Sequence, residues 1–467
     1  MKETLRFWGY GPDVFDELVG PGQPLCCPVN GSAKPVFGRV ELTNELIERC
    51  GPLREQCAPG WWTWLMLEPS VPVEGEPAAW FCTPQGDRRP IVTRTTDNPF
   101  CVWFDLDGTL SFIQNEGYLT RTLPAYLKLG VNPARIPEGL RKAAFVAMHR
   151  VRALRRQQKA AFPQRPADPS VDCWRYIVRS LVEDKLDVEG TPLWPDGKRF
   201  AVTLNHDIDS DYCFKRRGVL QSFHDIEHNA GLRSAWMVVT KLLDAGRSAL
   251  DELHAAGHEI GFHGSIHDHR LAFLPPEEMA RRIECAVELI DAYGTAGIRS
   301  PAYLRTPALF RALDGILEYD MSMHDVIFGP LSLSKYHEGC STCMPFFIEG
   351  MNLLEIPTTV PEDWTFDLQG TSLEQAWNVQ VQTVERIKSR AGVANILTHP
   401  EPHHSVKPRW LELYRRLVAH VAEDDDAWFA LPGEINRHWR SRQAAIDARW
   451  EPAQARRPAV PLGLGTS

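Results

Sequence analysis

The sequence predicts an α/β fold whose C-terminal part is a parallel sheet made of repeated β–α units. From Trp174 onwards, short apolar runs alternate with helical stretches, as in chains whose strands lie parallel and side by side. Ionisable residues end or closely follow several of these runs. Charged groups are costly inside a buried strand, so they are expected where the chain leaves the sheet. Active sites of β/α barrels lie at this end of the strands, so the pattern favours closure into a barrel. The runs are Phe200–Leu204, Ala235–Val239, Glu259–Phe262, Gly297–Ile298, Ile316–Tyr319, Leu353–Ile356, Ala394–Leu397 and Trp428–Leu431.

Helical stretches fill most of the intervals between these runs. The clearest extends from Pro275 to Tyr293, where prolines open the helix and acidic residues fill its first turn. Its apolar face is expected to contain Met279, Ile283, Val287 and Ile290. Further helices are expected at about Phe214–Asn229, Arg247–Ala256, Leu373–Arg390, Arg409–Ala422 and Glu434–Ala445.

The chain is expected to contain two domains, because 467 residues exceed what one hydrophobic core usually holds. Residues 1–165 are predicted to form a smaller α+β N-terminal domain of unassigned function, since short apolar segments there alternate with Pro and Gly. Within it, Trp61–Leu67 fits a buried strand or a buried helix. Residues 166–445 are predicted to form the barrel, and residues 446–467 a flexible tail.

The composition indicates which classes of binding partner and which cellular compartment to expect. A net charge of −9, spread along the chain, gives no footprint for nucleic acid or for an anionic membrane surface. No stretch reaches the length of a membrane span, and Met1–Gly9 lacks the apolar core of a signal peptide, so a cytoplasmic protein is expected. Eleven scattered cysteines are then expected to be reduced thiols. The oligomeric state is left open.

Two segments carry the groups of a metal centre. The first apolar run leads into Asp207 and Asp209, which are separated by one residue. A later run ends at His263, and His267 follows four residues on. Two carboxylates and two imidazoles form the ligand set of a catalytic zinc-like ion with an open position.

The span from about Trp174 to Arg442 resembles the polysaccharide deacetylase family. Four segments match its motifs in order, and a fifth resembles the closing strand and helix of bacterial members with an Asp-x-Asp first motif. The resemblance implies a metal-dependent carbohydrate esterase with a distorted β/α barrel of about seven strands. The matching segments are Leu204–Asp209, His263–His267, Arg299–Pro301, Leu397–His399 and Trp428–Ile435.

The resemblance also implies a role for each matching residue. One divalent metal ion, expected to be zinc, would be held by Asp209, His263 and His267. Asp207 would then act as general base on a water molecule, which is consistent with the lowered pKa of metal-bound water. Arg299 would hold Asp207 ionised and oriented, as an opposite charge within hydrogen-bonding distance does.

His399 would act as the general acid, because an imidazole can protonate a leaving amine near neutral pH. His403 and His404 follow closely, so a neighbouring histidine could take this role instead. Further candidates for lining the sugar cleft are Pro301, Tyr303, Asp320 and Trp364. The expected reaction is removal of an N-acetyl or other acyl group from an amino sugar in a polysaccharide, a glycolipid or a precursor.

Three further functions are compatible with the sequence. The segment Val102–Leu110 contains Asp105-Leu-Asp107-Gly-Thr, which resembles the nucleophile motif of the haloacid dehalogenase phosphatases. That motif needs a Lys and further acidic residues on a strand–helix alternation. The second function is that of a metal-free amidase acting on a cyclic ureide, and the third is that of a barrel that only binds carbohydrate.

Overall fold

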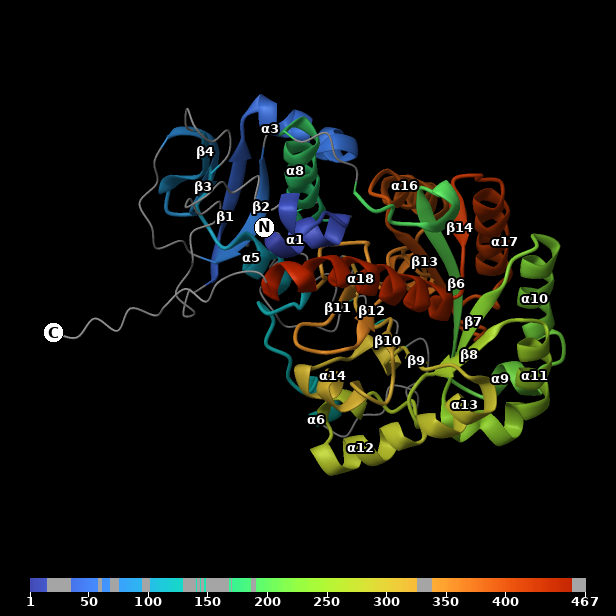
Figure 1. Ribbon diagram of the computed structural model, residues 1–467. Coiled ribbons are helices and arrows are strands. Elements are labelled where there is room, and N and C mark those ends of the chain that lie inside the picture. The colour runs from blue at the N-terminus through green and yellow to red at the C-terminus, as the bar shows by residue number, and fades with distance from the viewer. Residues whose placement is uncertain are drawn as a thin grey trace.

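The computed structural model contains two sheets, one antiparallel and near the N-terminus, the other mainly parallel and farther along the chain (Figure 1). It describes residues 1–14, 35–57, 61–67, 75–94, 101–128, 140, 143, 147, 168, 170–185, 190–325 and 338–455. Among these residues, no helix is both long and apolar enough to cross a membrane.

The N-terminal sheet has antiparallel strands in the order β2-β1-β3-β4-β5. They are β1 (Pro35–Leu42), β2 (Trp61–Leu67), β3 (Glu76–Cys82), β4 (Arg88–Arg94) and β5 (Cys101–Val102). Strand β2 is the segment for which the sequence left strand and helix open. Its side chains Trp64 and Met66 are buried, which is the period-two pattern of a strand with one face against a core.

The helical elements of the N-terminal part are α1 (Lys2–Trp8), α3 (Asn44–Arg49), the 3₁₀ turn η1 (Gly51–Leu53), α4 (Arg54–Cys57), α5 (Leu106–Gln114), α6 (Ala125–Lys128) and α8 (Ser170–Lys185). Helix α6 lies away from the N-terminal sheet, beside the barrel (Figure 1). Helix α8 contacts α1, α3 and α5, so it packs with the N-terminal elements. The sequence-based boundary at residue 165 had assigned α8 to the barrel instead.

The second sheet is curled and barrel-like, with the strand order β11-β12-β10-β9-β8-β7-β6-β13. All neighbours along it are parallel except β11 with β12, and β14 pairs with β6 beside the main path. Beyond β12 the chain reaches β13, because Val360 N–H donates to the Asn395 carbonyl (3.3 Å). This bond connects the segment after β12 to β13, the strand at the other edge of the sheet. The strands are β6 (Phe200–Ile208), β7 (Ser234–Val238), β8 (Glu259–Phe262), β9 (Gly297–Ile298), β10 (Tyr319–Asp320), β11 (Phe346–Phe347), β12 (Leu354–Glu355), β13 (Val393–Thr398) and β14 (Ala427–Phe429).

Helices connect and cover these strands (Figure 1). The predicted helix Pro275–Tyr293 is broken at Cys285 into two helices. The break changes the phase of the apolar stripe, so Ala286 and Leu289 are buried while Val287 is 45% exposed. The helices are α9 (Tyr212–Lys215), α10 (Val219–Asn229), α11 (Leu243–Ala255), α12 (Pro276–Glu284), α13 (Ala286–Tyr293), α14 (Pro307–Leu313), α15 (Asp363–Gln369), α16 (Leu373–Ser389), α17 (Pro408–Ala422) and α18 (Pro432–Ala455).

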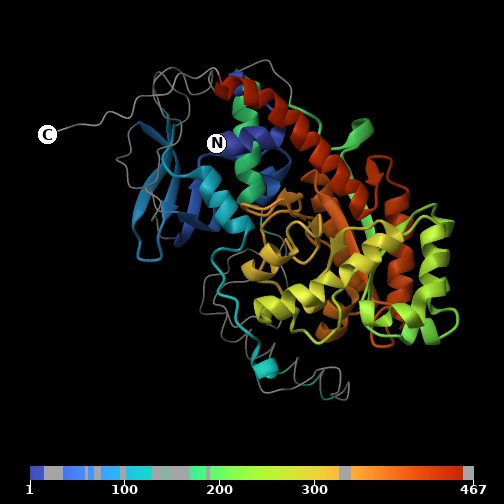
Figure 2. The ribbon, with the colours of Figure 1, turned by 60° about the horizontal axis from the view of Figure 1, so that its bottom comes forward.

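Helix α18 links the barrel to the N-terminal part, as its path across both shows in Figure 2. Its side chains donate hydrogen bonds to carbonyls at the end of α1: Arg442 to Phe7 (2.6 Å) and Trp450 Nε1 to Tyr10 (3.0 Å). The helix therefore continues through residues that the sequence assigned to a flexible tail. The rest of that predicted tail, residues 456–467, lies outside the described residues.

Buried charges also join the two parts. Glu116, which follows α5, pairs with Arg305 of the barrel, and its Oε2 accepts from Arg305 Nε at 2.8 Å. Burial raises the pKa of Glu116, but the guanidinium groups of Arg121 and Arg305 outweigh it and hold that pKa at about 2. Nearby, the Tyr118 hydroxyl donates to the Gly339 carbonyl (2.5 Å). The contact between the two parts is thus polar as well as apolar.

We expect Glu116→Ala to destabilise the protein by about 3–5 kcal/mol, because Arg305 would be left buried without its carboxylate. Urea unfolding followed by circular dichroism measures this as a lower midpoint. The matched control is Glu374→Ala, since Glu374 pairs with Arg416 on the exposed surface. An unchanged midpoint in Glu116→Ala would show that this ion pair does not hold the two parts together.

Candidate active site

A carboxylate and two imidazoles meet at the C-terminal ends of β6 and β8. Asp209 follows β6, His263 follows β8, and His267 lies in the loop beyond. Asp209 Oδ1 lies 3.1 Å from His263 Nε2 and 3.3 Å from His267 Nε2. One ligand atom from each residue lies within 4.8 Å of the others. These distances allow the three side chains to bind one ion.

The orientation of His263 is fixed by the backbone. Its Nδ1 lies 2.7 Å from the carbonyl oxygen of Arg299, which can only accept a hydrogen bond. Nδ1 therefore carries a proton, and Nε2 is the ring atom that faces Asp209. A ring nitrogen held by a carbonyl in this way is typical of histidines that bind metal ions.

The charges of Asp209, His263 and His267 affect one another's pKa values. Burial raises the pKa of Asp209, but the His267 and His263 rings outweigh it, so that pKa is held far below its usual range. Burial also lowers the pKa of His267. An ionised carboxylate beside a neutral imidazole is the donor set that a zinc-like ion requires, so the residues present fit such an ion.

Asp207 and Arg299 form a buried ion pair next to these ligands. Arg299 Nη1 donates to Asp207 Oδ1 (2.9 Å), and Asp207 Oδ2 lies 3.9 Å from His263 Nε2. Burial lowers the pKa of Arg299, but the Asp207 carboxylate outweighs it and raises that pKa. Arg299 also donates to the Met321 carbonyl (3.2 Å) and is fully buried. One oxygen of Asp207 is thereby held by the guanidinium, while the other faces the metal-ligand side.

His399 follows β13 and is held by Asp363 at the start of α15. His399 Nδ1 lies 3.0 Å from Asp363 Oδ1, and its Nε2 lies 3.8 Å from Glu362 Oε2. Burial lowers the pKa of His399, but Asp363 outweighs it and raises that pKa well above the usual range. Conversely, burial raises the pKa of Asp363, but His399 holds it at about 2. The Asp363 carboxylate therefore favours the protonated form of the His399 ring.

Glu362 and Asp363 were missed by the sequence reasoning. Burial raises the pKa of Glu362 to about 7, and its Oε2 accepts a hydrogen bond from the Tyr303 hydroxyl (3.0 Å). A signal was present, because two adjacent acids follow the apolar run Leu353–Ile356 and directly precede Trp364. Acids placed after a predicted strand of a barrel belong to the end where sites form.

The candidates for lining the sugar cleft take different positions. Pro301 and Tyr303 belong to the turn after Arg299, and Tyr303 reaches Glu362. Trp364 is half-buried in α15. Asp320 has no exposed surface, and its carboxylate accepts bonds from the amide and hydroxyl of Ser322. Asp320 is thus buried and hydrogen-bonded within the protein, and its carboxylate is not exposed to solvent.

Gly264, directly after His263, is explained by its conformation. Its φ is +80°, and an added Cβ would lie 3.1 Å from the Pro301 ring. A side chain here would strain the loop that leads to His267.

The loop that carries His267 also touches the N-terminal part. The Tyr126 hydroxyl, from α6, lies 3.0 Å from His269 Nδ1, and Arg270 donates to the Leu127 carbonyl (3.2 Å). The His269 ring in turn packs edge-on against His267, with ring centroids 4.9 Å apart. The N-terminal part thus supports one wall of the candidate site.

Asp105 and Asp107 have structural partners. Asp105 caps α5 by accepting from Gly108 N–H (2.9 Å), and Asp107 accepts from the amides of Glu3 (2.9 Å) and Thr4 (3.2 Å) at the start of α1. The preceding strand, β5, is antiparallel to β4 rather than part of a strand–helix alternation. This arrangement does not favour a phosphatase.

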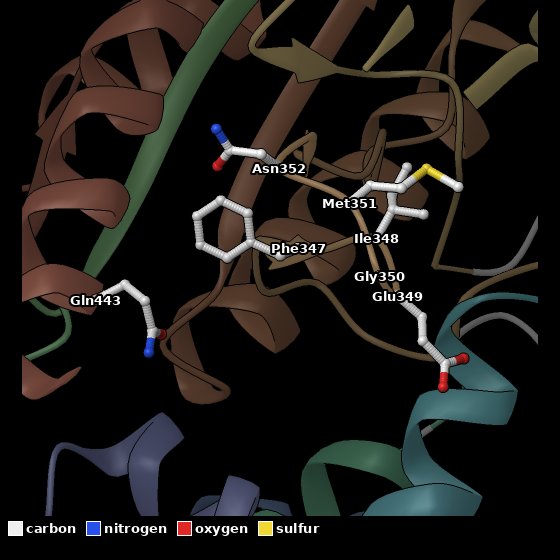
Figure 3. Close-up of a pocket in the computed structure, with 7 residues that line it drawn as sticks. All are labelled: Phe347, Ile348, Glu349, Gly350, Met351, Asn352 and Gln443. Atoms are coloured by element: carbon white, nitrogen blue, oxygen red, sulfur yellow. The ribbon is translucent and has the colours of Figure 1, made fainter. Parts of the chain in front are cut away.

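A hollow elsewhere on the barrel contains none of the predicted site residues (Figure 3). It has a volume of about 430 Å³ and lies between the turn after β11 and α18. It is lined by Phe347, Ile348, Glu349, Gly350, Met351, Asn352 and Gln443.

Fold and site together define a barrel-like α/β protein with a candidate metal centre at the carboxyl ends of its strands. Residues 198–314 match the family model described as polysaccharide deacetylase, which confirms the predicted resemblance. The expected enzyme class, a carbohydrate deacetylase and hence a hydrolase, is the class of this family. No curated protein matches the chain.

Three solved structures are similar to the chain. A protein assigned as a polysaccharide deacetylase from Mycobacterium smegmatis is 18% identical, with 54% of this chain and 93% of that chain covered and a TM-score of 0.43. A Pseudomonas aeruginosa PAO1 protein, also assigned as a polysaccharide deacetylase, is 15% identical, with coverage of 54% and 95% and a TM-score of 0.43. PuuE allantoinase is 15% identical, with coverage of 54% and 94% and a TM-score of 0.43.

We expect Asp363→Asn to lower the pKa of His399, because the variant removes the charge that stabilises the imidazolium while burial still opposes it. The protonated fraction of His399 at pH 7 should fall accordingly. NMR titration of the His399 ring measures the change. Asp367→Asn is the matched control, since Asp367 is a buried aspartate of the same helix that binds Lys407 and Arg409. Equal titration curves for His399 in the wild type and Asp363→Asn would contradict the pairing.

Proposed function

We propose that this protein is a metal-dependent hydrolase that removes an N-acetyl group from an amino sugar. The observation that carries the proposal is the convergence of Asp209, His263 and His267 beside the buried Asp207–Arg299 ion pair. The ligand set suits zinc, and the barrel would comprise about seven strands, counting the segment that bonds to β13. Location in the cytoplasm and an intracellular precursor as substrate are part of the same proposal.

Asp209, His263 and His267 would hold the ion. When bound, a divalent ion with three protein ligands acidifies a water molecule and polarises the amide carbonyl. Asp207 would accept a proton from the attacking water through the oxygen that Arg299 leaves free. Arg299 keeps that carboxylate in place, because its own guanidinium is fixed by Met321.

His399 would complete the reaction as general acid. Breaking the amide bond leaves an amine that must gain a proton, and water supplies the hydroxyl group of the released carboxylic acid. His399 is suited to donate this proton because Asp363 raises the pKa of the ring and so favours its protonated form. Its Nε2 is the free ring atom, since Nδ1 is bound to Asp363.

The competing functions receive less support. A phosphatase would need Asp105 and Asp107 to be available, whereas both bind backbone amides. A barrel that only binds carbohydrate would not require the ligand set together with a paired carboxylate and a protonated histidine. A metal-free amidase is separated from the proposal by metal analysis.

We expect the purified protein to contain one divalent ion at the barrel site and to release acetate from N-acetylated glucosamine oligosaccharides. His263→Ala should lose both the ion and the activity. Asp207→Asn should retain the ion, yet its kcat should fall by about 10²–10⁴-fold because the general base is lost. Metal analysis by mass spectrometry and an acetate assay give the two readouts.

The matched control is His228→Ala, which changes an exposed histidine of α10 and should preserve ion and activity. Full turnover in Asp207→Asn would remove the assignment of the base. Retention of the ion in His263→Ala would remove the metal site, and a metal-loaded wild type without deacetylase activity would remove the proposed function.

A further inference from the structure

Three cysteines converge in the core of the N-terminal part, away from the barrel site. Cys50 ends α3, Cys57 is the last residue of α4, and Cys173 lies near the start of α8. Their sulfur atoms all lie within 4.8 Å of one another, and none of the three residues has exposed surface. The cluster therefore joins the α3–α4 segment to α8.

One buried cysteine needs no explanation, because free cysteine is among the most buried residue types. Three sulfurs meeting at one point are different, since they are brought together from separate helices. The nearest pair, Cys57 and Cys173, are 2.8 Å apart although 116 residues separate them in the sequence. Convergence of several thiols is what thiophilic metal ions require of a protein.

We propose that Cys50, Cys57 and Cys173 form a second metal site, which binds one thiophilic metal ion of the zinc type through its three sulfurs. Binding exchanges thiol protons for a cation, and this exchange permits thiolates in an apolar core, where unpaired thiolates would be costly.

The rival is a disulfide between Cys57 and Cys173. A disulfide would use only two of the three sulfurs and would leave Cys50 as a free thiol beside it. An ion accounts for all three. The site would stabilise α8, and α8 in turn carries Asp172, which binds Arg390 of the barrel (Oδ2 to Nε, 2.8 Å). The ion is therefore structural, and loss of it should lower Tm without removing the groups of the barrel site.

Cobalt(II) is the probe that separates the two metal sites. The proposed barrel ligands are nitrogen and oxygen atoms, so they give no thiolate-to-cobalt charge-transfer absorption, whereas the cysteine cluster does. We expect this absorption when reduced full-length protein is loaded with cobalt, and we expect it to persist in His263→Ala. It should disappear in Cys57→Ala and in Cys173→Ala. Cys340→Ala, which changes a buried cysteine outside the cluster, is the matched control.

The wild type alone can overturn the proposal. Cobalt-loaded wild type without the charge-transfer absorption would exclude the site even if the cysteine variants fail to fold. Thiol counting on the denatured, metal-free protein, purified without reductant, should give all eleven thiols. A count lower by two, with the missing thiols mapped to Cys57 and Cys173 by peptide mass spectrometry, would establish the disulfide instead. Neither result depends on deacetylase activity.

Discussion

Arg299 is the residue on which the geometry of the candidate active site depends. Its guanidinium binds Asp207, while its backbone carbonyl accepts the Nδ1–H of His263. The side chain has no exposed surface, and a buried cation is stable only when it is paired and hydrogen-bonded. Its pairing therefore fixes Asp207 and His263 together. A single residue thus positions both of these groups of the candidate site.

The same constraint operates where the N-terminal part meets the barrel. Arg305 is buried against Glu116, and Arg390 lies between Asp172 of α8 and Asp325 of the barrel. In each case an arginine of the barrel pairs with a carboxylate of the N-terminal part. Separating the two parts would therefore leave these charged groups without their partners, which is unfavourable. Tyr126 of the N-terminal part also contacts His269, so the loop that carries His267 is held by the N-terminal part as well. The N-terminal part is thus a support for the site as well as a folded unit with its own sheet.

The parallel strands and the ionisable residues at their ends could be predicted from the sequence because both are local patterns. Strands β6, β7, β8 and β13 coincide with continuous apolar runs, as strands buried on both faces do. The break at Cys285 was not predictable, since no proline or glycine marks it. The thiol cluster was also missed, because the spacing of Cys50 and Cys57 matches no zinc motif and Cys173 is distant in sequence. Contacts that arise only when separate helices pack have no local signal.

Glu362 and Asp363 show why proximity alone does not assign roles. The two acids are adjacent and both are buried, yet Asp363 has a lowered pKa and Glu362 a raised one. His399 accounts for the difference, because its Nδ1 bonds to Asp363 at 3.0 Å while Nε2 stays 3.8 Å from Glu362. Asp363 is thereby paired with the His399 ring, whereas Glu362 accepts a hydrogen bond from the Tyr303 hydroxyl. A neutral hydroxyl stabilises the ionised carboxylate less than a charged ring does. Burial raises the pKa of Glu362 to about 7, so the charge of this carboxyl depends on pH in the neutral range. Because Glu362 lies beside His399, the proposed proton donor, its charge affects the pKa of the His399 ring.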